Sequence, residues 1–135
     1  MGRGARDPVR DARGVALVGV RLALADRDAT RRQSLATVVG HVAGITVVGE
    51  AGNTRELAEL LRREHPDALI VDDRLLSHDG HALAGLGPHR AGMRLIVLGI
   101  DADPAYAARA RRLGADAWVV TERAPEELPR LLGSS

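Results

Sequence analysis

Short apolar runs alternate with amphipathic stretches over most of this chain. Runs such as "ALIV" and "LIVL" lack polar alternation, which is typical of parallel strands that are covered on both faces. The predicted strands span residues 20–26, 45–51, 67–73, 94–100 and 117–122. The predicted helices span residues 27–42, 53–65, 80–87, 103–114 and 124–132. Five strand–helix units predict an α/β fold, a doubly wound five-stranded parallel sheet with helices on both faces.

Single residues mark the ends of several predicted helices. Thr54 is a candidate N-cap for the second helix, and Pro66 stops that helix. Gly114 follows the last periodic residue of the fourth helix, and Pro129 is expected to shorten the fifth. Residues 1–14 are rich in Gly, Arg and Asp without an apolar period, so we expect a mobile tail followed by one domain over residues 15–133.

Composition narrows the range of functions. The chain has 135 residues with 19 basic against 18 acidic side chains, and this near-neutral balance argues against a dedicated nucleic-acid binder. All basic residues are arginine and cysteine is absent, which excludes lysine chemistry, thiolate nucleophiles and disulfides. Trp118 and Tyr106 are the only aromatic residues. We expect a cytoplasmic protein with no membrane anchor and no direct contact with nucleic acid.

Acidic residues end two of the predicted strands. Asp26 ends the first, while Asp72 and Asp73 end the third. In an open parallel sheet, the working crevice lies beyond the carboxyl ends of the strands, so these acids should be neighbours. Adjacent side chains point to opposite sides, so we expect Asp26 and Asp72 to form an acidic pocket. Asp28 is expected to cap the following helix, and Asp73 to be solvated.

Four segments in order resemble the receiver domains of two-component response regulators, of the NarL/FixJ type. They are "VRLALADRDATRRQSL", "ITVVGEAGNTRELAELL", "PDALIVDDRLLSHDG" and "RLIVLGIDADPAYAARARRLGADAWVV". The resemblance extends from about Val20 to Leu132. It implies the flavodoxin-like receiver fold with strand order 2-1-3-4-5, and a role in phosphorelay signal transduction and transcription regulation.

The resemblance also assigns site positions. It implies that Asp72 is the phospho-acceptor, that Asp26 is an acid on the metal side, and that Trp118 is the switch aromatic residue. Other positions depart from the family pattern, in which an acid, a hydroxyl residue, a lysine and a proline are usual. Their occupants here are Arg27, Gly99, Thr121 and Leu76, respectively.

These departures predict an atypical receiver with a degenerate phosphorylation site. Arg27 removes one carboxylate ligand and adds a positive charge, so we expect Asp26 and Asp72 to bind Mg²⁺ poorly. We expect Arg27 to lie in the crevice and to pair with Asp26 or Asp72, in place of a metal. Because charge neutralisation at the transferring oxygens is weakened, phosphorylation of Asp72 should be impaired or absent. The expected mode of action is protein–protein contact without catalysis.

Two other hypotheses about the function are compatible with the sequence. The chain could be a working receiver switch that is phosphorylated on Asp72. The segment "ALADRDAT" also fits the D-x-D-x-T opening of haloacid-dehalogenase-type phosphatases, with Asp26 as nucleophile, Asp28 as general acid or base and Thr30 as a positioning residue. The absence of lysine argues against this enzyme. The expected partner is a histidine kinase or another signalling protein, with a homodimer as a further arrangement.

Overall fold

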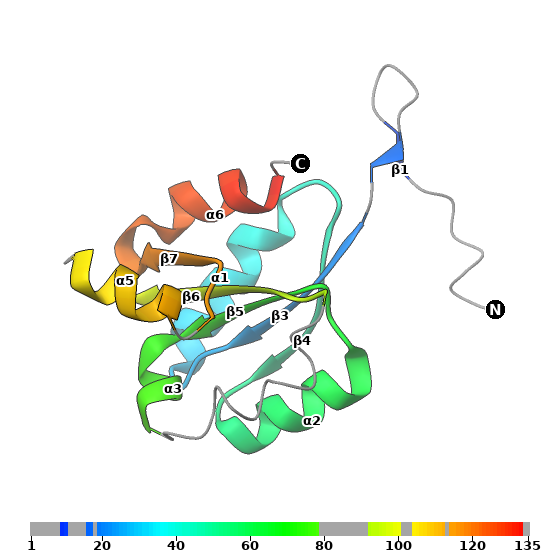
Figure 1. The fold of residues 1–135 in the computed structure, drawn as a ribbon. Coiled ribbons are helices and arrows are strands. Elements are labelled where there is room, and N and C mark those ends of the chain that lie inside the picture. Colours follow the sequence, from blue (N-terminus) through cyan, green and yellow to red (C-terminus); the bar gives the residue numbers. More distant parts are fainter. Residues whose placement is uncertain are drawn as a thin grey trace.

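A five-stranded parallel sheet with helices on both faces forms the centre of the computed structural model (Figure 1). The structure describes residues 9–10, 16–17, 19–78, 92–100, 104–112 and 114–133. The spatial order of the strands is β4-β3-β5-β6-β7. Counted from the first strand of the sheet along the chain, this is the predicted order 2-1-3-4-5. The predicted fold class is confirmed.

The strands lie close to the predicted ranges. They are β3 (Val20–Ala25), β4 (Ile45–Ala51), β5 (Ala68–Asp72), β6 (Arg94–Gly99) and β7 (Ala117–Val120). Every residue of β5 is buried, as expected for the central strand of a sheet that is covered on both faces. The register places Ala25 of β3 beside Val71 of β5. Asp26, which follows β3, and Asp72, the last residue of β5, therefore lie side by side.

The helices differ more from prediction than the strands do. They are α1 (Ala29–Gly40), α2 (Thr54–Glu64), α3 (Asp73–His78), α5 (Pro104–Arg112) and α6 (Ala124–Gly133), with the 3₁₀ helix η3 (Thr121–Arg123) before α6. The helix α3 begins directly after β5 and was not predicted. The predicted helix over residues 80–87 lies outside the described residues.

The core has one apolar cluster on each face of the sheet. On one face of the sheet, side chains of the strands pack against α2 and α5, and this cluster includes Leu57, Leu61 and Ala110. The other joins the opposite side chains to α1 and α6, and it includes Val39 and Leu128. Successive strand residues such as Leu69 and Ile70 divide between the two clusters, which follows from the alternation of side chains along a strand.

Helix ends show which local signals act. The N-cap of α2 is Asn53, whose side chain accepts a hydrogen bond from the Glu56 amide at 2.8 Å, so the expected cap Thr54 is wrong. Gly114 has a φ of 103°, as its predicted place after α5 requires.

The last helix does not end at its proline. α6 continues past Pro129 to Gly133, so the expected shortening is wrong. Leu128 and Leu132 are both buried, and they anchor the helix on each side of the proline. Tertiary packing therefore outweighs the local preference of Pro129.

Within the predicted tail, Val9–Arg10 (β1) pairs antiparallel with Ala16–Leu17 (β2). The other residues of 1–14 lie outside the described residues, and the mobility of this segment stays a prediction. In the described part of the chain, no helix combines the length and apolar character needed to span a bilayer.

Replacing Asn53 with Ala should lower the free energy of unfolding by about 1 kcal/mol, because an amide at the start of α2 loses its acceptor. Urea denaturation followed by circular dichroism measures this change. The matched control is Thr54→Ala, which should stay within about 0.5 kcal/mol of the unaltered protein. A larger loss for Thr54→Ala than for Asn53→Ala would contradict this assignment of the cap.

Candidate functional site

Two buried carboxylates lie together where β3 and β5 end. Asp26 follows β3 and is 1% exposed, while Asp72 ends β5 and is 4% exposed. The parallel pairing of the two strands brings these residues together across 46 positions of sequence. Two buried carboxylates that lie side by side repel each other when both are charged, so a nearby positive charge would stabilise the pair.

Arg31 of α1 supplies that positive charge. Its Nε donates to Asp26 Oδ2 at 2.6 Å, and its Nη2 donates to Asp26 Oδ1 at 2.9 Å. The same Nη2 also reaches Asp72 Oδ2 at 3.3 Å. One guanidinium group therefore holds Asp26 with two hydrogen bonds and bridges to Asp72, and we call these three residues the Arg31 bridge.

The first turn of α1 aims Arg31 at the acids. Asp28 is the N-cap of α1, as expected, and its side chain accepts from the amides of Thr30 and Arg31 at 2.9 and 3.1 Å. The amide of Asp28 in turn donates to Asp26 Oδ1 at 2.8 Å. Helical side chains lean toward the N-terminus of their helix, so Arg31 reaches back over the cap to Asp26.

A second arginine fixes the same connection. Arg32 Nη1 donates to the carbonyl of Asp26 at 2.7 Å, and its Nε donates to Glu50 Oε1 at 3.1 Å. These contacts tie the backbone after β3 to the end of β4. The position of Asp26 is therefore set from both its side chain and its main chain.

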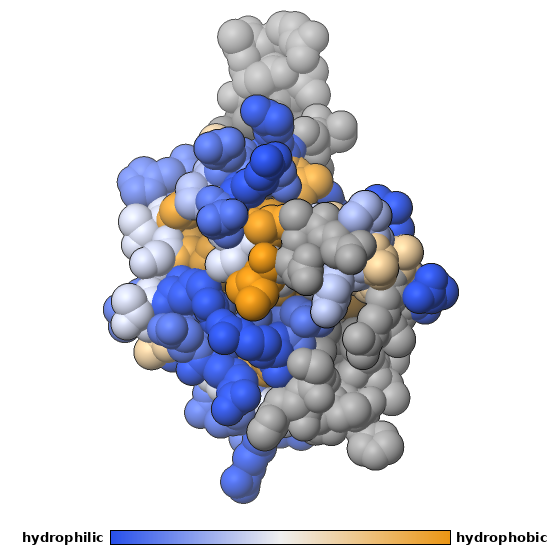
Figure 2. Space-filling model, turned by 90° about the vertical axis from the view of Figure 1, so that its left-hand side faces the viewer, coloured by the Kyte–Doolittle hydropathy of each residue, from blue (hydrophilic) through white to orange (hydrophobic). Residues whose placement is uncertain are grey.

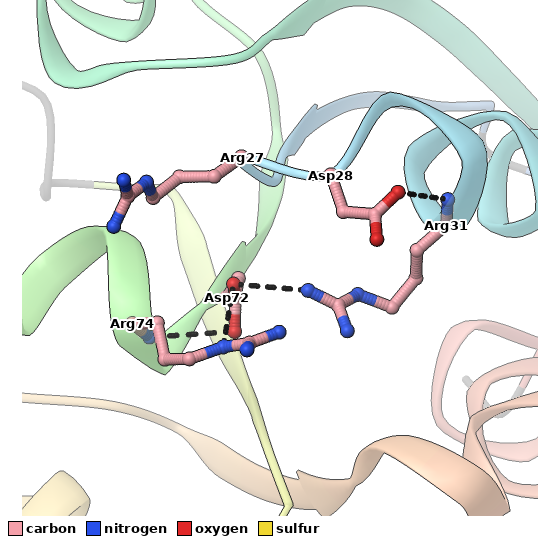
Figure 3. Close-up of a pocket in the computed structure, with 5 residues that line it drawn as sticks. All are labelled: Arg27, Asp28, Arg31, Asp72 and Arg74. Atoms are coloured by element: carbon pink, nitrogen blue, oxygen red, sulfur yellow. Dashed lines mark hydrogen bonds and ion pairs between the residues drawn. The ribbon is translucent and has the colours of Figure 1, made fainter.

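The predicted partner of the acids, Arg27, does not pair with them. Arg27 is exposed and lines the pocket, but no hydrogen bond or ion pair joins it to Asp26 or Asp72 in the described residues. Figure 3 shows its side chain extending away from Asp72. The expectation of an arginine in the crevice had the right chemistry and the wrong residue, because Arg31 occupies that place.

Asp72 has further contacts on its other side. Arg74 Nε lies 3.6 Å from Asp72 Oδ2, and the Arg74 amide donates to Asp72 Oδ1 at 3.3 Å. Above the carboxylate is a pocket of about 380 Å³ that is lined by Arg27, Asp28, Arg31, Asp72 and Arg74 (Figure 3). Both oxygens of Asp72 are thus engaged, and positive side chains flank the approach to them.

Burial, charge and hydrogen bonds shift the pKa values of Asp72, Arg31 and Asp28. Burial, followed by the nearby charge of Asp26, raises the pKa of Asp72 above its usual value, although Arg74 and Arg31 oppose the shift. The hydrogen bond to Asp26 raises the pKa of Arg31, so its guanidinium stays charged. The amide of Arg31 lowers the pKa of Asp28. Because the folded state binds the Asp72 proton more tightly, the contribution of Asp72 to stability improves as the pH falls through its folded pKa.

The carboxylates do not fit a divalent metal ion as they stand. Mg²⁺ requires close octahedral contacts to oxygen, and the facing oxygens of Asp26 and Asp72 already accept from the Arg31 guanidinium. Within the described ranges, no group of three or more metal-ligating side chains could hold an ion.

Comparison with known proteins decides the family. The model of the response regulator receiver domain matches residues 22–132. This chain belongs to that family. Receiver domains act in two-component signalling, interact with histidine kinases and typically bind Mg²⁺ at the phosphorylation site.

Individual relatives agree with the family match. The chain is 26% identical over 110 residues to YxjL of Bacillus subtilis (strain 168), an uncharacterised transcriptional regulatory protein. The match covers 81% of this chain and 50% of that protein, so the chain spans about half the length of this curated relative.

Solved receiver structures share the fold. The receiver domain of the response regulator NarL from Mycobacterium tuberculosis has a TM-score of 0.74 at 21% identity, over 86% of this chain and 94% of that one. The response regulator RcsB of Salmonella typhimurium has a TM-score of 0.78 at 20% identity, over 87% of this chain and 60% of that one.

At the end of β6, the ring of Trp118 fills the space that a side chain at residue 99 would occupy. Gly99 ends β6, and a Cβ atom there would collide with Cη2 and Cζ2 of Trp118. Trp118 in turn stacks with Tyr106, with ring centroids 6.0 Å apart. Thr121 Oγ1 donates to the carbonyl of Gly99 at 3.2 Å. Gly99 therefore contacts both Trp118 and Thr121, whereas the side chain of Leu76 lies outside the described residues.

The Gly99→Ser variant should lower the free energy of unfolding by about 1–3 kcal/mol, because the new side chain displaces the Trp118 ring. A shift in the emission of Trp118, the only tryptophan, should accompany the loss. In a Trp118→Leu background, the same Gly99→Ser change should cost less. An equal cost in both backgrounds would mean that the ring does not determine the need for glycine.

Proposed function

We propose that this receiver domain is atypical and signals through protein–protein contact, with phosphorylation of Asp72 impaired or absent. The main support for this proposal is that the Asp72 carboxylate is buried and paired with arginine. It is 4% exposed, and it contacts the guanidinium groups of both Arg31 and Arg74. A carboxylate must present a free oxygen in line with the phosphodonor to accept a phosphoryl group.

The composition of the site supports the same proposal. Phosphoryl transfer depends on positive groups that neutralise the transferring oxygens. The chain has no lysine, and Thr121, directly after β7, donates to a backbone carbonyl instead. Gly99 provides no hydroxyl group. Arg31 and Arg74 contact the Asp72 carboxylate, so their charges are already compensated.

Exposed apolar side chains beside the site support a role in protein contact. Ile100, directly after β6, is 74% exposed, and Tyr106 of α5 is 39% exposed. Figure 2 shows apolar surface next to hydrophilic surface on the face that lies at the left of Figure 1. We propose a histidine kinase or another signalling protein as the partner, or a second copy of the chain, and no direct contact with nucleic acid.

The phosphatase alternative gains no support from the site geometry. Asp26, its nucleophile, is held by two hydrogen bonds from Arg31. Asp28, its general acid or base, serves as the N-cap of α1, and Thr30 lies exposed in the first turn of that helix. We therefore propose a signalling domain without catalytic residues of its own.

Incubation with acetyl phosphate and MgCl₂, followed by intact mass measurement, tests the proposal. We expect little or no added phosphoryl group, because Asp72 is held by two arginines and lacks a lysine partner. A receiver domain with a complete site, treated in parallel, controls for the activity of the phosphodonor. Stoichiometric labelling that is lost in Asp72→Asn would overturn the proposal and favour a working phospho-acceptor switch.

A further inference from the structure

The Arg31 guanidinium occupies the space between the two acids of the crevice. Its Nη2 lies 2.9 Å from an oxygen of Asp26 and 3.3 Å from an oxygen of Asp72. An ion that bridged the two carboxylates would have to contact these same oxygens. The side chain of Arg31 is 22% exposed, against 2% for Asp26 and 5% for Asp72, so the guanidinium lies nearer the solvent than the two acids do.

The charges of the crevice balance without any metal. Asp26 and Asp72 carry two negative charges, and Arg31 and Arg74 supply two positive charges within 4 Å of them. A divalent ion would add two further positive charges beside two guanidinium groups, and that arrangement is repulsive. The carboxylate oxygens would also have to give up their hydrogen bonds to Arg31.

We propose that Arg31 is a built-in substitute for the divalent cation, so that the crevice excludes metal and keeps one conformation without it. The helix holds the substitute in place, because Asp28 caps α1 and Arg32 fixes the main chain of Asp26. The inference deepens the proposed function at the same site and rests on it. It also has a direct consequence: removal of the guanidinium should turn the crevice into a cation site.

Titration with MnCl₂, monitored by calorimetry and by the emission of Trp118, tests this inference on the full chain. The unaltered protein should show no saturable binding. Arg31→Gln should show saturable Mn²⁺ binding under the same conditions. The added substitution Asp72→Asn should remove the gain, because one of the two carboxylates is then lost.

Arg27→Gln is the matched control. It removes one positive charge from the same pocket, but Arg27 does not pair with either acid, so this variant should still exclude Mn²⁺. Equal gains in Arg27→Gln and Arg31→Gln would mean that net charge, and not the position of Arg31, excludes the ion. That result would overturn the inference.

Loss of Arg31 leaves two facing carboxylates, so Arg31→Gln could fold poorly without metal. Its thermal midpoint should then rise with MnCl₂, while that of the unaltered protein stays constant. A folded Arg31→Gln that does not bind Mn²⁺, or an unfolded one that Mn²⁺ does not rescue, would overturn the inference.

The two proposals fail in distinguishable ways. Saturable Mn²⁺ binding by the unaltered protein, without phosphoryl labelling, would overturn only the inference that Arg31 substitutes for the divalent cation. Labelling of Asp72 by acetyl phosphate in a protein that excludes Mn²⁺ would overturn the proposed function alone.

Discussion

Two buried carboxylates lie at the ends of neighbouring parallel strands, and they repel each other unless a positive charge lies beside them. Asp26 and Asp72 are both almost completely buried, and the register of β3 and β5 gives them no way to separate. Breaking a buried ion pair by removing one partner typically costs about 3–5 kcal/mol. Arg31 stabilises the carboxyl ends of β3 and β5, because one planar guanidinium donates hydrogen bonds to both acids. The other properties of the site depend on this interaction.

A guanidinium and a metal ion solve the same electrostatic problem with different consequences. A metal ion can leave, exchange and accept a phosphoryl oxygen as a further ligand. Arg31 is tethered to α1 and already uses its hydrogen bonds on the carboxylates. Nearby, the ring of Trp118 fills the space beside Gly99, and Thr121 donates to the Gly99 carbonyl. This difference is why we propose that the contacts of the domain do not depend on phosphoryl transfer.

The sequence predicted the sheet well because burial on both faces leaves a strong local signal. Strands such as β5 are uninterrupted apolar runs, whereas the order of the strands was implied by the resemblance to receiver domains. The strand-end acids were also predictable, because position at the carboxyl end of a strand determines where Asp26 and Asp72 lie. Helix ends were harder: Asn53 and Thr54 are both capping residue types, and only the backbone geometry separates them.

The identity of the pairing arginine could not be read from its proximity in sequence. Arg27 is adjacent to Asp26, but its side chain leaves the strand end in another direction. Arg31 is five residues away, and the first turn of α1 returns it to Asp26. The available signal was Asp28 as N-cap, because a helix that begins there directs the side chain three positions later back toward the strand end.

A double-mutant cycle between Arg31→Gln and Asp26→Asn, measured by urea denaturation without metal, shows whether Arg31 stabilises the buried acids. We expect Arg31→Gln alone to be strongly destabilising and the two substitutions to be coupled by about 1.5–3 kcal/mol. The parallel cycle between Arg27→Gln and Asp26→Asn should show coupling below about 0.5 kcal/mol. Additive effects of Arg31→Gln and Asp26→Asn would mean that the guanidinium of Arg31 is not the cation that stabilises the two acids.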